Sequence, residues 1–312
     1  MAKVIGPGSL ITDVTGFAPH LPAVGETAKG TTLRFGPGGK GSNQMTAAHR
    51  AGSDVRLISC RGNDFLGALI HDFYVREGMS EEYIRVCDDA ETGSALIEVS
   101  ETDAQNRIIM ILAANERVGR DAVLAAEKEF ADSGAVLAQF ETTPEAVLAA
   151  KELAKKYNKP FILNPAPCIP MPDGLYDGID YLTPNETEAE LLTGVKVDTL
   201  EDCRLAADKL FSLGVKNAII TLGAKGVYYR GSEKELMVPA ITSVRAIDTT
   251  GAGDAFNGGF ATAIAEGLPI ETALRFATCT AAISVTRLGT GPSMPQREEI
   301  LSLMKKEYGH TL

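Results

Sequence analysis

Short runs of apolar residues alternate with stretches of helical period along most of the chain. The runs predict buried strands near residues 3–6, 55–59, 135–139, 160–163, 180–182 and 217–222. Elsewhere apolar residues recur every three or four positions, which predicts helices near residues 45–51, 65–77, 119–131, 144–156, 199–213, 256–264, 269–287 and 296–306. Strands that alternate with helices indicate a parallel sheet with right-handed crossovers.

Residues 82–113 interrupt this alternation. Segments 82–86, 94–100 and 107–112 are strand-like, and polar turns without a helix separate them. Such a patch inside an alternating α/β chain predicts a small antiparallel insertion that serves as a lid.

Composition narrows the class of protein. The chain has 312 residues, 45% hydrophobic and 23% charged, which are ordinary values for a globular protein of one large domain or two. The net charge of −11 argues against nucleic acid and anionic membranes as partners. It leaves an anionic substrate open, because a local nest of backbone N–H groups binds phosphate whatever the net charge.

Cysteine usage and hydropathy bear on the compartment. The five cysteines include no C-x-x-C pair, which indicates reduced thiols rather than a disulfide frame or a zinc site. The first 20 residues lack the apolar core of a signal peptide, and no apolar run reaches membrane-spanning length. We therefore expect a cytoplasmic protein.

The most informative segment is residues 247–256, with the sequence IDTTGAGDAF. Asp248 closes an expected extended segment, and Gly251, Ala252 and Gly253 precede Asp254 at the start of an apolar helix. Small residues that open a helix leave N–H groups bare, and the helix dipole favours an anion there. Phosphoryl transfer to an alcohol needs such groups together with a base for the hydroxyl. Asp254 as an ordinary helix cap explains the segment equally well when it is taken alone.

A second glycine-rich segment, residues 36–44, opens another helix. Its four glycines let a ligand approach the backbone, and Lys40 and Asn43 supply polar groups. It is not a Walker A loop, because no Ser or Thr directly follows Gly39-Lys40. We favour ligand contact over a structural loop. Asp13, just beyond the first strand, is either a ligand for a substrate hydroxyl or a turn residue.

Polar residues also follow later strands. Asn185 and Glu188 lie three apart at a helix start, where they form either a cap or a site for Mg²⁺ or phosphate. Gly223 and Gly226 either frame a nucleotide or make a hairpin turn. Residues 287–293 form a loop rich in carbonyl and hydroxyl oxygens.

Together these motifs resemble the ribokinase family of sugar kinases. The resemblance runs in order from about residue 4 to the C-terminus and rests on the segments GGKGSNQ (38–44), NPAP (164–167), TPNETE (183–188), ITLG (220–223) and DTTGAGD (248–254). It implies a single three-layer α/β/α domain over residues 1–312, with a central, mostly parallel sheet. It also implies a small β-sheet lid from residues of about 12–36 and 88–113, through which two chains form a homodimer.

The resemblance further implies an ATP-dependent kinase that phosphorylates the terminal hydroxyl of a pentose. Asp254 would be the base, and Gly251, Ala252 and Gly253 would form the anion hole. The sugar would be held by Asp254 with Ile11, Asp13, Gly39, Lys40, Asn43 and Glu141. ATP would lie along Asn185, Thr221, Gly223, Gly226, Gly253 and Thr278. Glu188 would hold Mg²⁺ through water, and an activating monovalent cation such as K⁺ would use Asp248, Thr250, Ser284, Arg287, Gly289 and Ser293.

Two positions depart from the family pattern. Family members carry a motif like G-S-x-N-x-D after the first strand, and Ile11 replaces the Asn that helps to hold sugar hydroxyls. An unpaired buried hydroxyl costs about 1–3 kcal/mol, so we hypothesise a sugar without that hydroxyl, such as 2-deoxyribose. Thr12 is an alternative source of the lost contact. Thr278 stands where Asn or His is common near the adenine.

Other functions compete with this one. A kinase of another small sugar or of a nucleoside uses the same motifs, and a sugar-binding protein without activity keeps the same scaffold. An NAD-dependent oxidoreductase is disfavoured, because Ile11 occupies the place of the third glycine after Gly6 and Gly8.

Overall fold

The structure is a computed structural model, and it describes residues 1–103 and 105–309. Its main feature is a nine-stranded sheet in the order β13-β12-β11-β10-β9-β8-β1-β4-β5. Neighbouring strands are parallel from β5 to β11, and β12 and β13 add an antiparallel hairpin. The strands are β1 (Lys3–Pro7), β4 (Asp54–Gly62), β5 (Ile84–Cys87), β8 (Ala135–Ala138), β9 (Phe161–Leu163), β10 (Tyr181–Leu182), β11 (Ala218–Thr221), β12 (Val227–Arg230) and β13 (Glu235–Val238).

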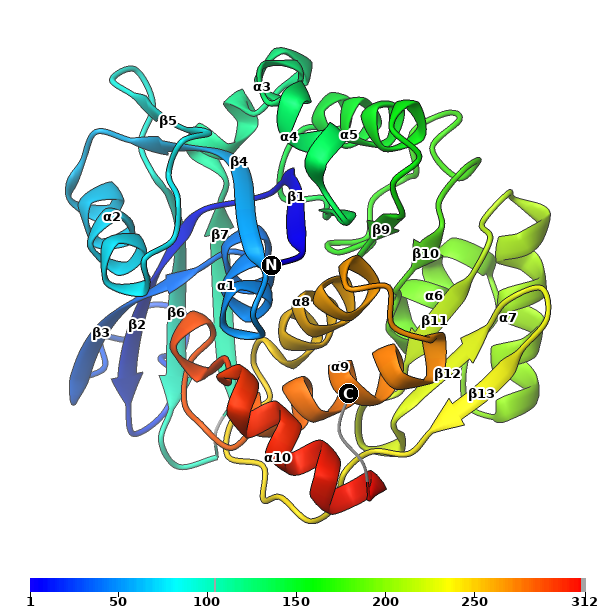
Figure 1. Ribbon diagram of the computed structural model, residues 1–312. Coiled ribbons are helices and arrows are strands. Elements are labelled where there is room, and N and C mark those ends of the chain that lie inside the picture. The colour runs from blue at the N-terminus through cyan, green and yellow to red at the C-terminus, as the bar shows by residue number, and fades with distance from the viewer. Residues whose placement is uncertain (104, 310–312) are drawn as a thin grey trace.

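Helices cover both faces of this sheet, so the predicted three-layer α/β/α architecture is confirmed (Figure 1). One face carries α1 (Lys40–Arg50), α2 (Phe65–Glu77), α8 (Ala252–Ala265), α9 (Ile270–Ser284) and α10 (Arg297–Tyr308). The other carries α3 (Arg120–Ala125), α4 (Glu127–Asp132), α5 (Pro144–Lys156), α6 (Glu186–Thr193) and α7 (Leu200–Ser212). Short 3₁₀ turns are η1 (Ala113–Arg117), η2 (Gly223–Lys225) and η3 (Gly291–Ser293).

Two hydrophobic cores result from the alternation of side chains along the strands. In β1, Val4 packs into the core under α1 and α8, whereas Ile5 packs into the core under α5. In β8, Leu137 packs into the core under α1 and α8, and Val136 packs into the core under α5. Strands buried on both faces have no polar side, which is why they appear in the sequence as continuous apolar runs.

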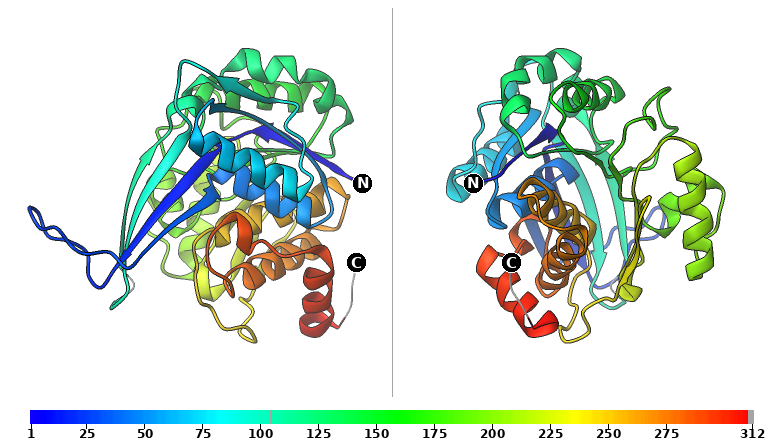
Figure 2. Two further views of the ribbon diagram at one scale, coloured as in Figure 1. Left: turned by 90° about the vertical axis from the view of Figure 1, so that its left-hand side faces the viewer. Right: turned by 45° about the vertical axis from the view of Figure 1, so that its right-hand side comes forward.

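A second, four-stranded sheet extends from the body of the molecule (Figure 2). Its order is β3-β2-β6-β7, formed by β2 (Ile11–Ala18), β3 (Thr32–Gly38), β6 (Gly93–Ser100) and β7 (Asn106–Ile111). The predicted sheet was antiparallel, but β2 and β6 pair in parallel while β3 and β7 pair antiparallel to them.

Some predicted elements are wrong. Segment 82–86 does not belong to the small sheet, because β5 pairs in parallel with β4 and follows it through α2 as an ordinary crossover unit. The helix predicted over 119–131 is divided at Ala126, which ends α3 and precedes α4. The extended segment expected before Asp248 is an irregular connection from β13 to α8.

The close approach of α1 to α8 positions the site. A Cβ atom at Gly258 would lie 2.3 Å from the carbonyl oxygen of Gln44 and 2.5 Å from Cβ of Ala47. Only glycine permits this spacing, which brings the first half of α1 against the first turns of α8. Within the described part of the chain, no helix is long and apolar enough to cross a membrane.

Candidate active site

Asp254 lies in the first turn of α8 but does not cap it. The N-cap is Gly251, in the left-handed region at φ 79°, and no side chain of the described residues caps this helix end. The Asp254 carboxylate instead accepts hydrogen bonds from two amides of α1, Asn43 Nδ2 at 2.9 Å and Gln44 Nε2 at 3.0 Å. Its side chain is 6% exposed. The capping interpretation of Asp254 is therefore wrong.

The start of α8 also presents unbonded backbone donors. The N–H of Ala252 donates to the Thr249 carbonyl at 3.2 Å, and that of Ala255 to the Gly251 carbonyl at 2.8 Å. No described residue accepts a hydrogen bond from the N–H of Gly251, Gly253 or Asp254. Bare N–H groups at the positive end of a helix dipole form an anion site. Of the predicted anion hole, Gly251 and Gly253 have bare N–H groups and Ala252 does not.

Gln44 is a site residue that sequence reasoning missed. Its Nε2 donates both to Asp254 and to Asn164 Oδ1, each at 3.0 Å. Gln139 Nε2 donates to Gln44 Oε1 at 2.7 Å and so fixes the orientation of the Gln44 amide. All four side chains are buried. Gln44 belongs to the predicted glycine-rich segment, but nothing in its sequence context marks it as a partner of Asp254.

The network continues to the neighbouring strand ends. Asn164 Nδ2 donates to the Thr183 carbonyl at 3.2 Å, and the Thr183 hydroxyl donates to Asn257 Oδ1 at 2.6 Å. Asn257 Nδ2 returns to the Gly253 carbonyl at 2.9 Å. Because the carboxyl ends of parallel strands meet at one edge, residues far apart in sequence fasten the first turn of α8 to β9 and β10.

The residues predicted to hold the sugar gather beside Asp254. Glu141 Oε2 accepts hydrogen bonds from the Ser9 hydroxyl at 2.5 Å and from the Lys40 N–H at 2.8 Å. The Asp254 carboxylate raises the pKa of the Lys40 ammonium, with a smaller contribution from Glu141. Burial raises the pKa of Glu141. The site thus combines buried acceptors with one lysine, a donor and acceptor set suited to hydroxyl groups.

Asp13 belongs to the same group. Burial raises the pKa of the Asp13 carboxyl to about 7, the Thr290 hydroxyl lowers it, and the nearby charges of Glu141 and Asp254 raise it further. The backbone of β3 approaches this carboxylate closely, since a Cβ at Gly38 would lie 2.4 Å from Asp13 Oδ1. Gly39 has φ 87°, and a Cβ there would lie 2.9 Å from the Ile11 nitrogen.

The structure decides the role of Thr12. Ile11 is 2% exposed and shares a face of β2 with Asp13, two residues away. Thr12 points to the other face, where its hydroxyl donates to the Leu66 carbonyl at 3.0 Å. The alternative in which Thr12 replaces the missing Asn is therefore wrong.

Asp254 and Lys40 line a cavity of about 570 Å³. Every residue predicted to bind ATP lines it: Asn185, Thr221, Gly223, Gly226, Gly253 and Thr278, together with Glu188. Apolar residues of the 239–250 connection, of α9 and of the position directly after α9 complete its wall, namely Ala240, Ile241, Val244, Ala246, Ala281, Ala282 and Val285. Sequence reasoning missed the residues of the 239–250 connection because an irregular connection has no periodic signal.

For the pairs Asn185/Glu188 and Gly223/Gly226, the structural interpretation from the sequence is correct and is compatible with the ligand-binding one. Asn185 and Glu188 form a reciprocal capping box, with Asn185 N to Glu188 Oε2 at 2.9 Å and Glu188 N to Asn185 Oδ1 at 2.8 Å. Gly223 and Gly226 form the turn between the antiparallel strands β11 and β12. These residues line the cavity as well, so neither structural role excludes ligand contact.

The loops predicted to hold a monovalent cation are adjacent. Asp248 accepts hydrogen bonds from Thr250 N at 2.9 Å and Gly289 N at 3.0 Å, and so joins the segment before α8 to the segment after α9. Arg287 donates its backbone N–H to the Ser284 carbonyl at 3.2 Å and pairs with Glu299. The Ser293 hydroxyl donates to the Thr290 carbonyl at 2.7 Å. Among described residues, no group of three or more His, Cys, Asp or Glu side chains is arranged to hold a metal ion.

Comparison with known proteins defines the class of enzyme. Residues 1–297 match the model of the pfkB family of carbohydrate kinases. The protein is a phosphotransferase with an alcohol acceptor. The chain belongs to the pfkB carbohydrate kinase family, and several of the family members that it resembles are ribokinases. This membership excludes the NAD-dependent oxidoreductase considered above.

Individual relatives support this assignment. The chain is 39% identical over 298 residues to the ribokinase of Haemophilus influenzae, covering 96% of this chain and 97% of that one. It is 35% identical over 304 residues to the deoxyribokinase of Salmonella typhi, covering 95% and 97%. The structure of Arabidopsis thaliana ribokinase complexed with ribose and ATP matches with a TM-score of 0.87 and 33% identity, covering 98% of this chain and 99% of that one.

Proposed function

We propose that this protein transfers the γ-phosphoryl group of ATP to the terminal primary hydroxyl of a pentose. One observation carries the proposal. The buried Asp254 carboxylate lines the cavity of about 570 Å³, beside unbonded N–H groups of its own helix turn. Transfer to an alcohol needs both a proton acceptor and fixed donors for the transferring phosphoryl group, and this site offers both.

Each part of the site has a role in this reaction. Asp254 takes the proton of the sugar hydroxyl, and its bonds from Asn43 and Gln44 hold the carboxylate in one orientation. The bare N–H groups of Gly251 and Gly253 stabilise the charge on the phosphoryl oxygens. Lys40 lines the cavity and adds a positive charge near Asp254.

Sugar and nucleotide occupy separate parts of the site. Asp13, Gly39, Lys40, Asn43 and Glu141 hold the sugar hydroxyls. ATP extends along the cavity, with its phosphates near Asn185 and its base against the apolar wall; Thr221, Gly223, Gly226 and Thr278 line that path. The volume of about 570 Å³ is of the size expected for such a ligand.

The residues present fit the two ions of the proposed reaction. The capping box uses one oxygen of Glu188, which leaves the other for a water molecule of hydrated Mg²⁺. Magnesium neutralises phosphate charge when it is bound. The paired loops around Asp248, Thr250, Ser284, Arg287, Gly289 and Ser293 are rich in carbonyl oxygens, which suit K⁺.

We infer that the sugar lacks one hydroxyl of ribose, with 2-deoxyribose as the leading candidate. The apolar Ile11 side chain is buried on the face of β2 that carries Asp13, and Thr12 points away from it. A hydroxyl facing Ile11 would lose its hydrogen bond. The chain is 39% identical to the ribokinase and 35% identical to the deoxyribokinase, so overall identity leans towards ribokinase and Ile11 is the feature that favours the deoxy sugar.

The small sheet serves as a lid and as a dimer interface in this proposal. It bears large exposed apolar side chains, namely Leu33, Phe35, Leu96, Ile108, Ile109, Met110 and Ile111. An apolar surface of this kind marks an interaction site, and a second copy of the chain would cover it.

All five cysteines are free, as expected for a protein of the cytoplasm.

The decisive experiment is ATP turnover by the purified protein with Mg²⁺ and K⁺. The panel contains ribose, 2-deoxyribose, other pentoses, fructose and nucleosides. We expect one pentose to stand well above the rest. Turnover with nucleosides alone would show that the substrate is a nucleoside and not a pentose. Sugar binding without turnover would show that the chain is a sugar-binding protein.

A further inference from the structure

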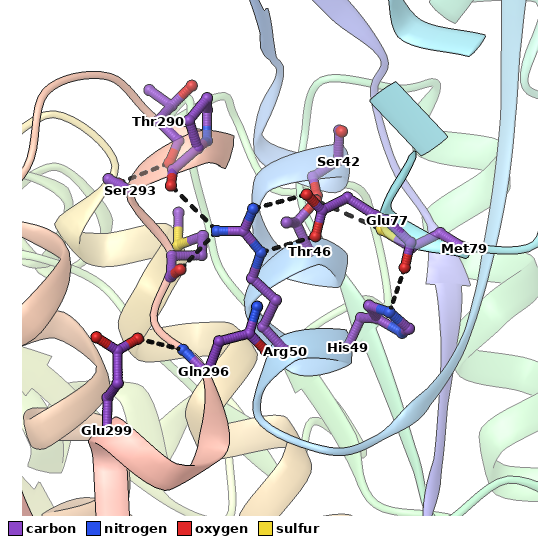
Figure 3. Close-up of polar contacts among 12 residues, drawn as sticks. Ser42, Thr46, His49, Arg50, Glu77, Met79, Thr290, Ser293, Gln296 and Glu299 are labelled. Carbon is purple, nitrogen blue, oxygen red and sulfur yellow. Dashed lines mark hydrogen bonds and ion pairs between the residues drawn. The ribbon is translucent and has the colours of Figure 1, made fainter. Parts of the chain in front are cut away.

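Arg50, at the end of α1, joins three segments of the chain (Figure 3). Its Nε and Nη2 donate to the two carboxylate oxygens of Glu77 at 2.8 Å and 2.7 Å. Its Nη1 donates to two backbone carbonyls, those of Pro292 at 3.0 Å and Met294 at 2.6 Å. The guanidinium thus connects α1 to the end of α2 and to the segment 290–294, which contains η3.

The other end of this segment reaches the sugar site. The Thr290 hydroxyl donates to the Pro37 carbonyl at 3.0 Å and lies 3.4 Å from Asp13 Oδ2. Thr290 is 8% exposed. The Thr290 carbonyl in turn accepts from the Ser293 hydroxyl at 2.7 Å, which ties the two ends of η3 together.

The same segment packs beside the proposed base. The Met294 side chain is fully buried against Ala47 of α1 and Ala255 of α8, the residue after Asp254. Arg50 therefore holds the backbone of a segment that contacts Asp13 through Thr290 and the first turn of α8 through Met294. Arg50 itself contacts none of the residues assigned to sugar or nucleotide.

We propose that Arg50 is a positioning residue that holds segment 290–294 against the site, so that Thr290 stays beside Asp13 and the sugar binds tightly. The proposal rests on the proposed function, because the ligand whose affinity it describes is the sugar. The fork of the guanidinium suits this task, since it serves a carboxylate and two carbonyls at once. The single ammonium of a lysine cannot reproduce that arrangement.

Electrostatics gives the proposal a pH signature. Among the groups that act on Asp13, burial and the negative charges of Glu141 and Asp254 favour the protonated form, and Thr290 alone favours the charged form. When Thr290 moves away, the pKa of Asp13 rises further. Asp13 then loses its acceptor capacity for sugar hydroxyls at a higher pH than in the unchanged protein.

The test compares Arg50→Met and Arg50→Lys with a matched control, Arg56→Met. Arg56 is similarly buried and ion-paired, to Asp54 and Glu129, but it lies near the start of β4, away from the site. At saturating K⁺ we expect Arg50→Met to raise KM for the sugar about tenfold, the loss expected for one or two charge-assisted hydrogen bonds. KM for ATP should change little, and Arg50→Lys should recover only part of the loss. The increase of KM at low pH should begin at a higher pH in Arg50→Met.

A double-mutant cycle separates positioning from stability. Thr290→Val removes the hydroxyl without touching Arg50, so its effect on KM should not add to that of Arg50→Met. Additive effects, or an equal rise in KM from Arg56→Met, would overturn the proposal. If Arg50→Met does not fold, a sugar KM and pH profile unchanged in Thr290→Val would overturn it as well. A wild-type protein without sugar-dependent turnover would instead refute the proposed function.

Discussion

Gln44 Nε2 donates a 3.0 Å hydrogen bond to Asp254 Oδ1, although the two residues are 210 positions apart in the chain. The bond joins the first half of α1 to the first turn of α8. Gln44 thereby holds the proposed base, while Gln139 holds Gln44.

Replacing Gln44 should therefore impair both activity and stability. In Gln44→Met the Asp254 carboxylate keeps only Asn43 as an amide donor, and the buried Gln139 amide loses its acceptor. We expect kcat to fall by about 10²-fold, the loss expected when a catalytic group is misplaced by about 1 Å. The free energy of unfolding should fall by about 1–3 kcal/mol for buried polar groups left unpaired. Steady-state kinetics and urea unfolding measure the two effects, and an unchanged kcat would contradict the role of Gln44.

Asp254→Asn tests the base itself. The amide is similar in size to the carboxylate but cannot accept the hydroxyl proton. We expect turnover to fall by about 10²–10⁴-fold, the usual contribution of a general base. Calorimetric titration should still detect binding of ATP and of the sugar. Near-normal turnover would count against Asp254 as the base.

The raised pKa of Asp13 predicts a pH-dependent stability. The carboxyl has its usual value of 3.8 when the chain is unfolded and about 7 when it is folded. Between these values the folded protein retains a proton that the unfolded chain releases, so the stability contributed by this group decreases as pH rises. Asp13→Asn removes the titration. Its free energy of unfolding relative to wild type should therefore increase from pH 4 to pH 7.5 and level off above, as urea titrations at several pH values can measure. A constant difference would contradict the assigned pKa.

Ile11→Asn should restore the missing polar contact for ribose. We expect the ratio of kcat/KM for ribose to that for 2-deoxyribose to rise about tenfold, which corresponds to one hydrogen bond to a buried hydroxyl. Ile11→Leu, which stays apolar, is the matched control and should leave the ratio unchanged. An equal change in both variants would show that packing, not hydrogen bonding, determines the preference.

Ile109→Asp tests the interface on the small sheet. The side chain is 63% exposed in the single chain, so a charge there should not disturb the fold. If a second copy covers this surface, burial of the charge should shift the protein from dimer to monomer in sedimentation velocity. Leu213→Asp is the control. Leu213 is 43% exposed and lies at the end of α7, away from the small sheet. A monomeric wild type would refute the dimer.

Elements with strong local signals could be predicted from the sequence. Helix α2 has the predicted bounds, 65–77, because Asp64 caps its start by accepting from Gly67 N and Gly78 ends it in the left-handed region. Helix α5 matches as well, with Thr143 as its cap and proline in its first turn. In each case the residues that decide the boundary are neighbours in sequence.

Features that depend on distant partners could not be predicted. Strand β5 looks like part of an insertion until its pairing with β4 is seen. The role of Gln44 requires β8, β9 and α8 to meet at one place, and its own neighbours in α1 give no sign of this. The apolar wall of the cavity comes partly from an irregular connection, for which hydrophobic periodicity gives no prediction.

The absence of a side chain at Gly258 sets the distance between α1 and α8, and with it the geometry of the proposed base. Because α1 and α8 touch where a methyl group would not fit, the thickness of that contact fixes how far Asn43 and Gln44 stand from Asp254. A methyl group at position 258 would push the two helices apart and so lengthen the hydrogen bonds from Asn43 and Gln44 to Asp254. It would do so without replacing any residue assigned to ligand binding. The alignment of Asn43 and Gln44 with Asp254 thus depends on how closely two helices pack in the interior of the protein.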